Sequence, residues 1–285
     1  MRLLLKVDRD EYRPVRFARP KTKQALSMQD FRQSVRSGAM QLGTFIKTPS
    51  HQIPEILGVS GLDFAIIDCE HAAFDVEALD RMALAARAAG LPCLVRIPEL
   101  NAATIGQILD QGLSGIMVPH VKDPGSATAA LAAAKYGLGH RGFSPSTRAA
   151  GHGTADPVAY RSAADRESSV WCQIEDAAAL ARLDDIAAID QIDCLFLGRA
   201  DLALSLKVES QNDPKVVAAV TATAEAGRRH GRAIGIFIGD TAEIPDLLAL
   251  GITVFVCGSD QSFVLAQARR IRKEMSAYLA AKPAH

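Results

Sequence analysis

An alternation of apolar runs and helical stretches is the feature of this sequence that most limits its fold. Short apolar segments recur along the chain, each followed by a polar or glycine-containing turn and then by an amphipathic or alanine-rich stretch. Strands that are apolar on both faces and alternate with helices are typical of a parallel sheet covered by helices. The expected strands are Leu42–Lys47, Phe64–Cys69, Cys93–Ile97, Gly115–Val118, Val170–Ile174, Cys194–Leu197, Ile234–Ile238 and Thr253–Cys257.

Eight such units predict an α/β fold of the (β/α)8 TIM-barrel type, which typically takes about 250 residues. A doubly wound sheet usually has fewer strands and a crevice-binding motif. The chain has 285 residues, 48% of them hydrophobic, which is enough for one large core. We expect a single barrel domain over residues 27–285 that begins with a helix capped by Ser27. Residues 1–26, rich in Arg and Pro, are expected to form an N-terminal extension outside the barrel.

The charge balance and the cysteines narrow the class of protein. Basic and acidic residues number 32 each, so the chain lacks the positive bias that nucleic acids and anionic membranes favour. No apolar run approaches the ~20 residues that cross a bilayer, and no signal-peptide pattern opens the chain. The cysteines lie in apolar segments without metal-ligand spacing, which indicates buried, reduced thiols. We expect a cytoplasmic protein whose partners are small molecules or copies of itself, with no nucleic acid and no membrane.

Polar side chains gather where the expected strands end. In a TIM barrel the carboxyl ends of all strands meet at one face, and that face carries the active site. The polar side chains at these ends are Asp68, Glu70, His71, Arg96, His120, Gln173, Glu175, Arg199, Asp201, Ser259 and Asp260. Their convergence predicts an active site at this rim.

These residue types indicate metal-assisted chemistry on a small oxyacid. Glu175 and Asp201 are the candidate metal ligands, because two carboxylates from adjacent strand ends suit a hard ion such as Mg²⁺ or Mn²⁺. His71 is the candidate acid/base, and Asp68 is expected to hold its other ring nitrogen. Arg96 offers a planar fork for a carboxylate or a developing enolate oxygen. The metal and Arg96 would share the enolate charge while His71 moves protons.

Each assignment has a plain structural alternative. Asp201 is as well placed to cap the helix that follows it as to bind a metal. Glu175 is followed by Asp176, which can cap the next helix in its place, so metal binding by Glu175 is somewhat favoured. His71 and Arg96 can form an ion pair at the rim. The histidines without an evident orienting partner are expected to be loop or surface residues; they are His51, His120, His140 and His152.

Two other chemistries are less well supported. A nucleophilic Cys69 would lie between Asp68 and Glu70, whose charges raise the pKa of a thiol, and strand alternation points it away from both. A Schiff-base aldolase needs a lysine near the mouth, and Lys47 is the obvious candidate. No partner that would lower the pKa of Lys47 is evident in the sequence, so the metal mechanism is favoured.

Six segments, taken in order, resemble the class II pyruvate-dependent aldolases of the HpcH/HpaI family. They are "DFAIIDCEHAAFD", "LVRIP", "GLSGIMVP", "GHRGFS", "CQIED" and "LFLGRADLALSL". The resemblance covers about Leu42 to Asp260, nearly the whole expected barrel. It implies a lyase that reversibly cleaves a 4-hydroxy-2-oxo acid to pyruvate and an aldehyde through a metal-stabilised pyruvate enolate. The implied cofactor is a divalent ion, Mg²⁺ or Mn²⁺, with Co²⁺ as a further candidate.

The resemblance also implies roles for individual residues. Glu175 and Asp201 would be the metal ligands, and Arg96 would face the pyruvyl oxygen. Gln173 would contact the substrate or metal-bound water, and the backbone around Ala200 would receive the pyruvate carboxylate. These roles come from matching positions in the family pattern and not from spacing.

Further positions bear on the acid/base, the aldehyde pocket and the assembly. His71 would act at the aldehyde oxygen or through metal-bound water, with Glu70 nearby. Asp110 matches a family carboxylate that reaches a neighbouring subunit's site; family members are typically hexamers, trimers of dimers that exchange their C-terminal helices. By this analogy we expect a homohexamer. Phe45 stands where many members have Trp and Arg199 where many have Pro, so both the shape and the charge of the aldehyde pocket are expected to differ.

Two alternative functions stay open at this point. A citryl- or malyl-CoA lyase-like enzyme would need a CoA-binding surface, and the sequence shows no basic cluster for one. A non-catalytic barrel would bind an oxyacid without turning it over. Release of pyruvate from 4-hydroxy-2-oxo acids, and its loss on chelation of the metal, would separate these functions.

Overall fold

The predicted barrel is present in the computed structural model, which describes residues 28–280. Eight parallel strands close into a barrel in the order of the chain. The extension 1–26 and the Ser27 cap lie outside the described residues. The strands are β1 (Gln41–Ile46), β2 (Phe64–Asp68), β3 (Cys93–Arg96), β4 (Gly115–Val118), β5 (Ser169–Ile174), β6 (Cys194–Leu197), β7 (Ala233–Ile238) and β8 (Val254–Ser259).

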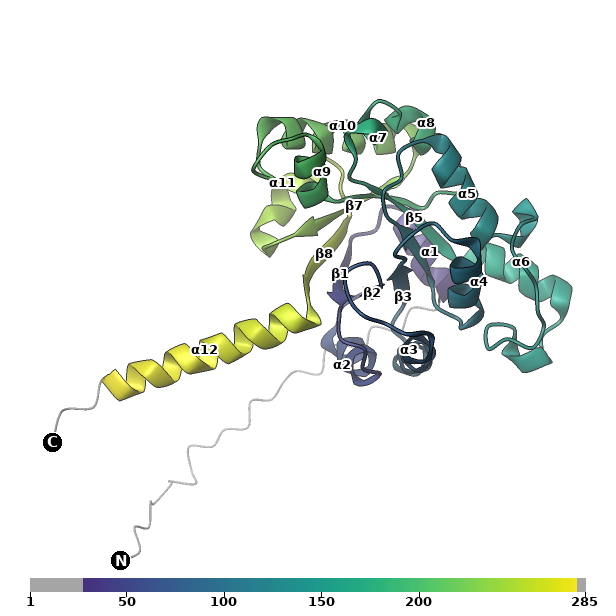
Figure 1. Cartoon of the computed structure of the whole chain (residues 1–285), viewed down its shortest axis with the longest axis horizontal. Coiled ribbons are helices and arrows are strands. Elements are labelled where there is room, and N and C mark those ends of the chain that lie inside the picture. Colours follow the sequence, from purple (N-terminus) through teal and green to yellow (C-terminus); the bar gives the residue numbers. More distant parts are fainter. Residues whose placement is uncertain (1–27, 281–285) are drawn as a thin grey trace, which may run out of the picture.

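Helices surround the barrel, as Figure 1 shows. They are α1 (Met28–Arg36), α2 (Gln52–Ser60), α3 (Val76–Ala89), α4 (Ala102–Asp110), α5 (Pro124–Ala134), α6 (Pro157–Glu167), α7 (Ala177–Leu180), α8 (Leu183–Ala187), α9 (Arg199–Ser205), α10 (Pro214–His230), α11 (Ile244–Ala249) and α12 (Asp260–Ala280). Short 3-10 turns lie at η1 (Tyr136–Leu138), η2 (Gly151–Gly153) and η3 (Thr241–Glu243).

Side-chain caps start several of these helices where the sequence offers them. Asp75 accepts a hydrogen bond from the backbone N–H of Ala78 at the start of α3. Asp123 and Ser126 exchange side-chain and backbone hydrogen bonds at the start of α5, which is a capping box. These caps fix where the loops end and therefore how each strand end is presented at the barrel mouth.

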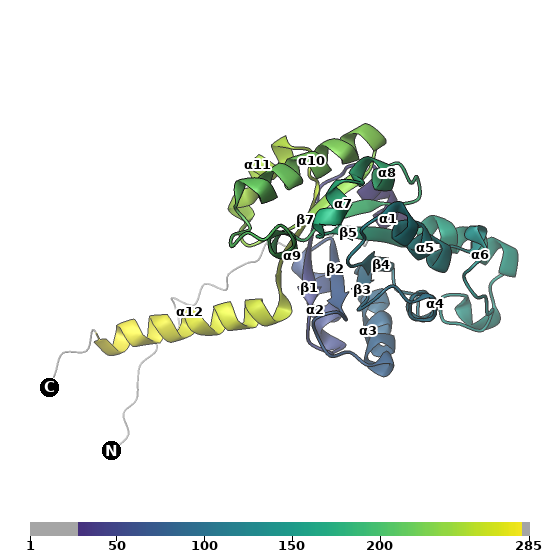
Figure 2. The same cartoon turned by 45° about the horizontal axis from the view of Figure 1, so that its top comes forward.

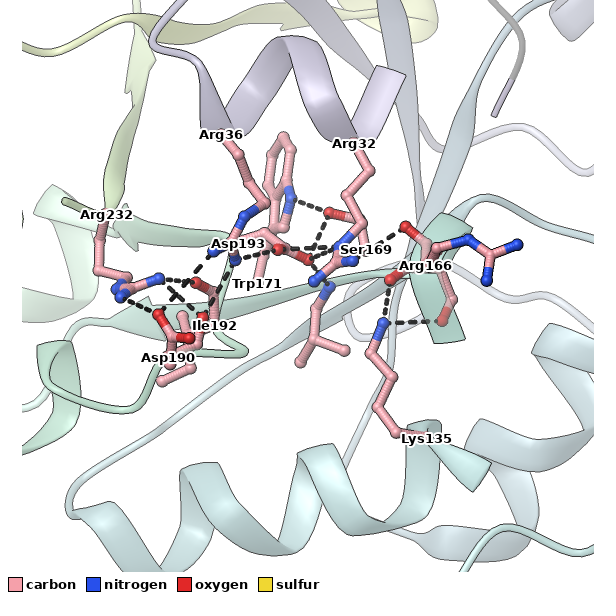
Figure 3. A network of polar contacts seen from close by, with 12 residues as sticks. Arg32, Arg36, Lys135, Arg166, Ser169, Trp171, Asp190, Ile192, Asp193 and Arg232 are labelled. Carbon is pink, nitrogen blue, oxygen red and sulfur yellow. Dashed lines mark hydrogen bonds and ion pairs between the residues drawn. The ribbon is translucent and has the colours of Figure 1, made fainter. Parts of the chain in front are cut away.

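Helix α1 closes the barrel at the amino-terminal ends of the strands. Its Phe31 is fully buried, with its ring centroid 5.6 Å from that of Phe64 and 6.3 Å from that of Trp171. Arg32 Nε donates to both oxygens of Asp193, at 3.0 and 2.9 Å, and Arg36 Nη1 donates to the same carboxylate at 3.0 Å (Figure 3). With this end sealed by aromatic rings and ion pairs, the opposite end is left for a ligand.

Helix α12 leaves the end of β8 and projects away from the barrel in both views (Figures 1 and 2). It exposes large apolar side chains, which are Phe263, Val264, Leu265, Ile271, Met275 and Tyr278. Among residues 28–280, no helix is both long and apolar enough to traverse a lipid bilayer.

Candidate active site

A cavity of about 570 Å³ opens at the carboxyl ends of the strands. Many residues that the sequence singled out line it; they are Phe45, Lys47, His71, Arg96, Gln173, Arg199, Ala200, Asp201 and Ser259. They come from loops or strand ends far apart in the sequence, and closure of the barrel brings them together. The cavity is also bordered by the aromatic side chains of Phe196 and Phe237.

Asp68 lies fully buried at the end of β2 and binds Arg96. Arg96 Nε donates to Asp68 Oδ1 at 2.9 Å, and Arg96 Nη2 and Lys47 Nζ lie 2.8 and 3.1 Å from Asp68 Oδ2. Burial alone would raise the pKa of Asp68, but the hydrogen bond and charge of Arg96, and then the hydrogen bond of Lys47, hold that pKa below its ordinary value. The carboxylate is therefore ionised, and the Lys47 amine is engaged in an ion pair.

Asp68 does not contact the imidazole of His71 as expected; it binds the backbone of His71 instead. Asp68 Oδ1 accepts from the backbone N–H of His71 at 3.2 Å, while the ring Nε2 lies 3.7 Å from Glu70 Oε2. The reason is strand register, because Asp68 pairs directly with Arg96 of β3 whereas His71 lies beyond the end of β2. Glu70 is thus the carboxylate beside the imidazole, and it also lies 3.2 Å from Arg96 Nε.

Glu175 is buried directly after β5, with each of its oxygens already in a hydrogen bond. Gln173 Nε2 donates to Oε2, and the backbone N–H of His120 donates to Oε1 at 2.8 Å. Gly198 leaves room for this carboxylate, since a Cβ there would lie 2.6 Å from Oε2. Burial raises the pKa of Glu175 to about 7, and the charges of Glu70 and Asp201 add to the shift against the opposing effect of His120.

His120 joins this group, although no partner for it is evident from the sequence. Its backbone has a φ of 53°, which is uncommon for a residue other than glycine. Its Nδ1 lies 3.0 Å from Asp176 Oδ2 and 3.4 Å from Glu175 Oε1, and its Nε2 lies 3.6 Å from Glu70 Oε1. Desolvation lowers the pKa of His120, but the hydrogen bond with Asp176 and the surrounding carboxylates raise it overall. The partners come from other strand ends, so no local signal in the sequence revealed them.

Neither Asp176 nor Asp201 caps a helix through its side chain. Asp176 takes the N-cap position of α7 without a side-chain cap hydrogen bond, because its carboxylate binds His120. Asp201 lies in the first turn of α9, whose N-cap is Gly198. Asp201 is thereby left to line the cavity, while Asp176 binds His120.

The donors around Glu175 fit a divalent cation. One ligand atom each from Glu70, His120 and Glu175 lie within 4.8 Å of one another, and Asp201 is close enough for its charge to affect Glu175. A buried carboxylate with a raised pKa beside two further carboxylates is an environment that a cation would relieve. Carboxylate oxygens suit Mg²⁺ or Mn²⁺, and an imidazole nitrogen adds affinity for transition metals such as Co²⁺.

Comparison with known proteins settles the family. The family described as HpcH/HpaI aldolase/citrate lyase matches residues 41–266. The chain belongs to this family. A 2-dehydro-3,6-dideoxy-6-sulfogluconate aldolase of Pseudomonas putida is 31% identical to this HpcH/HpaI protein over 232 residues, which are 81% of this chain and 90% of the relative. A pyruvate aldolase of Rhizobium etli is 31% identical over 237 residues, 82% of this chain and 92% of the relative.

A solved structure supports the same assignment. An HpcH/HpaI aldolase/citrate lyase family protein from Burkholderia cenocepacia J2315 superposes with a TM-score of 0.82 at 30% sequence identity. The match covers 87% of this chain and 99% of that one. The resemblance and the barrel expected from the sequence are both confirmed.

Asp110 is the one predicted site residue of this HpcH/HpaI protein that lies clearly elsewhere. It ends α4, and Arg141 Nη2 donates to its carboxylate at 3.0 Å. It borders a separate surface groove together with Phe143, Arg148 and His152. Within one subunit Asp110 therefore lies outside the active-site cavity. Its role at the active site of a neighbouring subunit stays a prediction.

The cysteines of this HpcH/HpaI protein are all free thiols, and not all of them are fully buried. Cys93, Cys172 and Cys194 are buried, whereas Cys69 and Cys257 are half-buried. Burial, with a smaller contribution from the charge of Asp68, raises the pKa of Cys69 to about 12. A thiol with such a pKa carries almost no thiolate at neutral pH, which agrees with the sequence argument against a nucleophilic cysteine.

Proposed function

We propose that this HpcH/HpaI protein is a metal-dependent aldolase, a carbon–carbon lyase that reversibly cleaves a 4-hydroxy-2-oxo acid to pyruvate and an aldehyde. The observation that carries this proposal is the shared cavity, in which Arg96, Gln173 and Asp201 line one pocket beside Glu175. The names of the relatives, which include a pyruvate aldolase of Rhizobium etli, support the same reaction class. The closed barrel supports it further, because its mouth is where TIM-barrel enzymes carry their active sites.

Arg96 is the residue we assign to the 2-oxo group. Its guanidinium is held in place by Asp68 and Glu70 and lies over the ring of Phe45, 4.7 Å from the ring centroid. A fork fixed in this way can donate to the oxygen that becomes negative when the C3–C4 bond breaks, without reorganising during the reaction. Asp68 then acts as a positioning residue for Arg96.

Glu175 and Asp201 are the residues we assign to the metal, with Mg²⁺ or Mn²⁺ as the expected ion and Co²⁺ as a further candidate. A divalent ion held by these carboxylates would supply Lewis-acid polarisation of the 2-oxo group. Gln173 lies against Glu175 and lines the cavity, so its amide can orient the pyruvyl group. The backbone at Ala200, which also lines the cavity, is our candidate for the pyruvate carboxylate.

His71 is the residue we assign to proton transfer at the aldehyde oxygen. In the cleavage direction a base takes the proton of the 4-hydroxyl group, the C3–C4 bond breaks, and C3 then accepts a proton to become the methyl group of pyruvate. The imidazole lines the cavity with about half of its side chain exposed, so it can exchange its proton with water. Glu70, next to the ring, can hold the imidazolium that forms.

A homohexamer built from dimers is the proposed assembly. Helix α12 projects from the barrel and exposes apolar side chains such as Ile271 and Met275, at 55% and 54%. Contiguous exposed apolar surface on a helix favours a protein partner, and a second copy of this chain is the partner we propose.

Release of pyruvate from a panel of 4-hydroxy-2-oxo acids tests the proposal. We expect cleavage that needs Mg²⁺ or Mn²⁺, stops after the metal is chelated and returns when it is added back. Full activity after thorough removal of metal would contradict the metal assignment. Turnover of malyl-CoA or citryl-CoA alone would favour a CoA-dependent lyase, and no turnover of any of these acids would favour a non-catalytic binding barrel.

A further inference from the structure

Arg199 is a buried arginine that faces the cavity from a different side than Arg96. It begins α9 after β6, whereas Arg96 ends β3, so the two side chains enter the barrel mouth from well-separated strands. Only 9% of Arg199 is exposed, and it lines the cavity. Burying a charged side chain beside a cavity has a cost in desolvation, so it calls for a functional explanation.

An aromatic wall connects the two arginines. The guanidinium of Arg96 lies over the ring of Phe45, and the ring centroid of Phe45 is 6.0 Å from that of Phe237. Arg199 Nη2 donates to the backbone carbonyl of Phe237 at 2.9 Å. A ligand that binds Arg96 at one end and runs along these two rings would reach Arg199 with its other end.

Glu243 holds Arg199 without using all of its donors. Arg199 Nη1 lies 2.8 Å from Glu243 Oε2, while Glu243 Oε1 accepts from the backbone N–H of Gly239 at 2.9 Å. Partial burial would raise the pKa of Glu243, but the hydrogen bond from Arg199 holds that pKa below its ordinary value. A guanidinium has five N–H donors, and Arg199 Nε has no hydrogen-bond partner among residues 28–280.

The charges on the cavity wall favour an anion near Arg199. Lys47, Arg96 and Arg199 all line the cavity, whereas Asp201 is the one carboxylate among the lining residues that the structure describes. Lys47 and Arg96 are both ion-paired with the buried Asp68. The counter-ions of the three cations, Asp68 and Glu243, both stand outside the lining, so cations outnumber carboxylates on the cavity wall. Arg199 is the one of these cations that binds the Phe237 backbone.

We propose that Arg199 binds a terminal carboxylate on the aldehyde portion of the substrate and so selects hydroxy-oxo acids that carry one. The proposal rests on the aldolase function proposed above and names its substrate class. With the 2-oxo group at Arg96, the rest of the substrate extends along Phe45 and Phe237 toward Arg199. A carboxylate matches the planar fork of a guanidinium, and the cavity of about 570 Å³ has room for such a chain.

The test compares two aldehydes of equal size in the aldol addition to pyruvate. Succinic semialdehyde ends in a carboxylate, and 4-methylpentanal carries an uncharged isopropyl group in its place. The value of kcat/KM is measured for both aldehydes, together with the KM of pyruvate, in the wild type, Arg199→Met and Arg199→Lys. Arg182→Met is the matched control, because Arg182 is an exposed arginine whose side chain binds Asp185 outside the cavity.

We expect Arg199→Met to lower kcat/KM for succinic semialdehyde by about 10- to 100-fold, the loss typical of one hydrogen bond to a charged group. The value for 4-methylpentanal should change far less, Arg199→Lys should restore part of the preference, and Arg182→Met should leave it intact. Equal losses for both aldehydes would overturn the proposal. So would a raised KM of pyruvate with an unchanged aldehyde preference, because that result assigns Arg199 to the pyruvate carboxylate.

A second variant, expected to raise the preference for the carboxylate-bearing aldehyde, tests the proposal if Arg199→Met does not fold. Glu243→Gln keeps an oxygen for the N–H of Gly239 but removes the counter-ion of Arg199. It should raise the preference for succinic semialdehyde over 4-methylpentanal, and an unchanged or reduced preference would contradict the proposal. Metal-dependent exchange of the pyruvate methyl protons with solvent needs no aldehyde and therefore tests the aldolase function separately from the role of Arg199. If the wild type shows no such exchange, the aldolase assignment itself is wrong.

Discussion

Arg96 and Asp68 form a doubly connected ion pair at the mouth of the barrel. Arg96 Nε donates to Asp68 Oδ1 at 2.9 Å and Arg96 Nη2 lies 2.8 Å from Oδ2, with both side chains almost completely buried. The pair follows from strand register, since the two residues are direct neighbours across β2 and β3. The carboxylate therefore fixes the guanidinium that we assign to the 2-oxo group.

Replacement of Asp68 by Asn should destabilise the protein substantially. The change keeps the shape of the side chain but removes the closer of the two carboxylates beside the buried guanidinium of Arg96, leaving Glu70, and breaking a buried ion pair typically costs about 3–5 kcal/mol. Urea unfolding measures the free energy. Asp75→Asn is the matched control, because Asp75 caps α3 and Asn caps as well as Asp, so its effect should be close to zero. Similar losses in both variants would argue against a stabilising ion pair.

The contribution of Asp68 to stability should depend on pH with a definite sign. Its pKa in the folded protein is lower than the ordinary 3.8, so near that pH the unfolded chain binds more protons than the folded one. The stabilisation is thus fully present above pH ~5 and is lost as the pH falls through the folded pKa. The difference in free energy of unfolding between wild type and Asp68→Asn, measured from pH 7 downward, should stay constant to about pH 5 and then shrink. A difference that grows in acid would contradict this.

The fold was predictable from the sequence because its signals are local. Runs of apolar residues end at turn residues, so the expected bounds of β4 and β6 match the structure and those of β2 and β3 differ by one residue. Local signals also mark the ends of helix α3, because Asp75 caps its start and Gly90, in the left-handed conformation, follows its last residue. The same alternation of apolar runs and helical stretches predicts the order of strands and helices, and eight such units predict the barrel.

The contacts inside the site were harder to predict because they depend on lateral neighbours. The sequence separation of Asp68 and His71 suggested a pair, but the register of β2 on β3 gives Asp68 to Arg96 instead. His120 gained its partners from other strands, Glu175 from the end of the adjacent β5 and Glu70 from the loop after β2. The position of Asp176 after β5 predicts a helix cap, but in the structure its carboxylate binds His120. Residue types at strand ends therefore predict the composition of the site but not its pairings.

Loss of Arg96 and loss of His71 should have different consequences. Arg96→Ala removes the donor to the developing enolate oxygen, so both retro-aldol turnover and exchange of the pyruvate methyl protons should fall by at least roughly 100-fold. His71→Ala removes the proton carrier at the aldehyde oxygen, so turnover should fall by about 100-fold or more while some methyl exchange remains. Proton NMR of pyruvate in deuterated buffer follows the exchange. If both variants kept wild-type turnover, the site assignment would be wrong.

The metal ligands can be distinguished by direct binding measurements. Glu175→Gln and Asp201→Asn should each weaken binding of Mn²⁺ by roughly 100-fold or more in titration calorimetry. Mutation of residues that only hydrogen-bond to a metal ligand already lowers metal affinity by about 10- to 100-fold, and loss of a ligand should cost at least as much. His120→Asn is the comparison, and Asn tolerates the positive φ at this position. We expect a smaller loss there. A larger loss for His120→Asn than for Asp201→Asn would move the ion to the Glu70, His120 and Glu175 group.

The projecting helix α12 should control assembly. Ile271→Glu introduces a charge on a side chain that is 55% exposed in one subunit, without disturbing a buried contact of the barrel, and Glu is a good helix former. If α12 packs on a second copy, the charge would be buried at that contact, so in sedimentation velocity the Ile271→Glu variant should form smaller species than the wild type, for which we propose a hexamer. Gln267→Glu adds the same charge at a polar position of α12 and should leave the assembly intact. A monomeric wild type, or equal effects of the two variants, would refute this role.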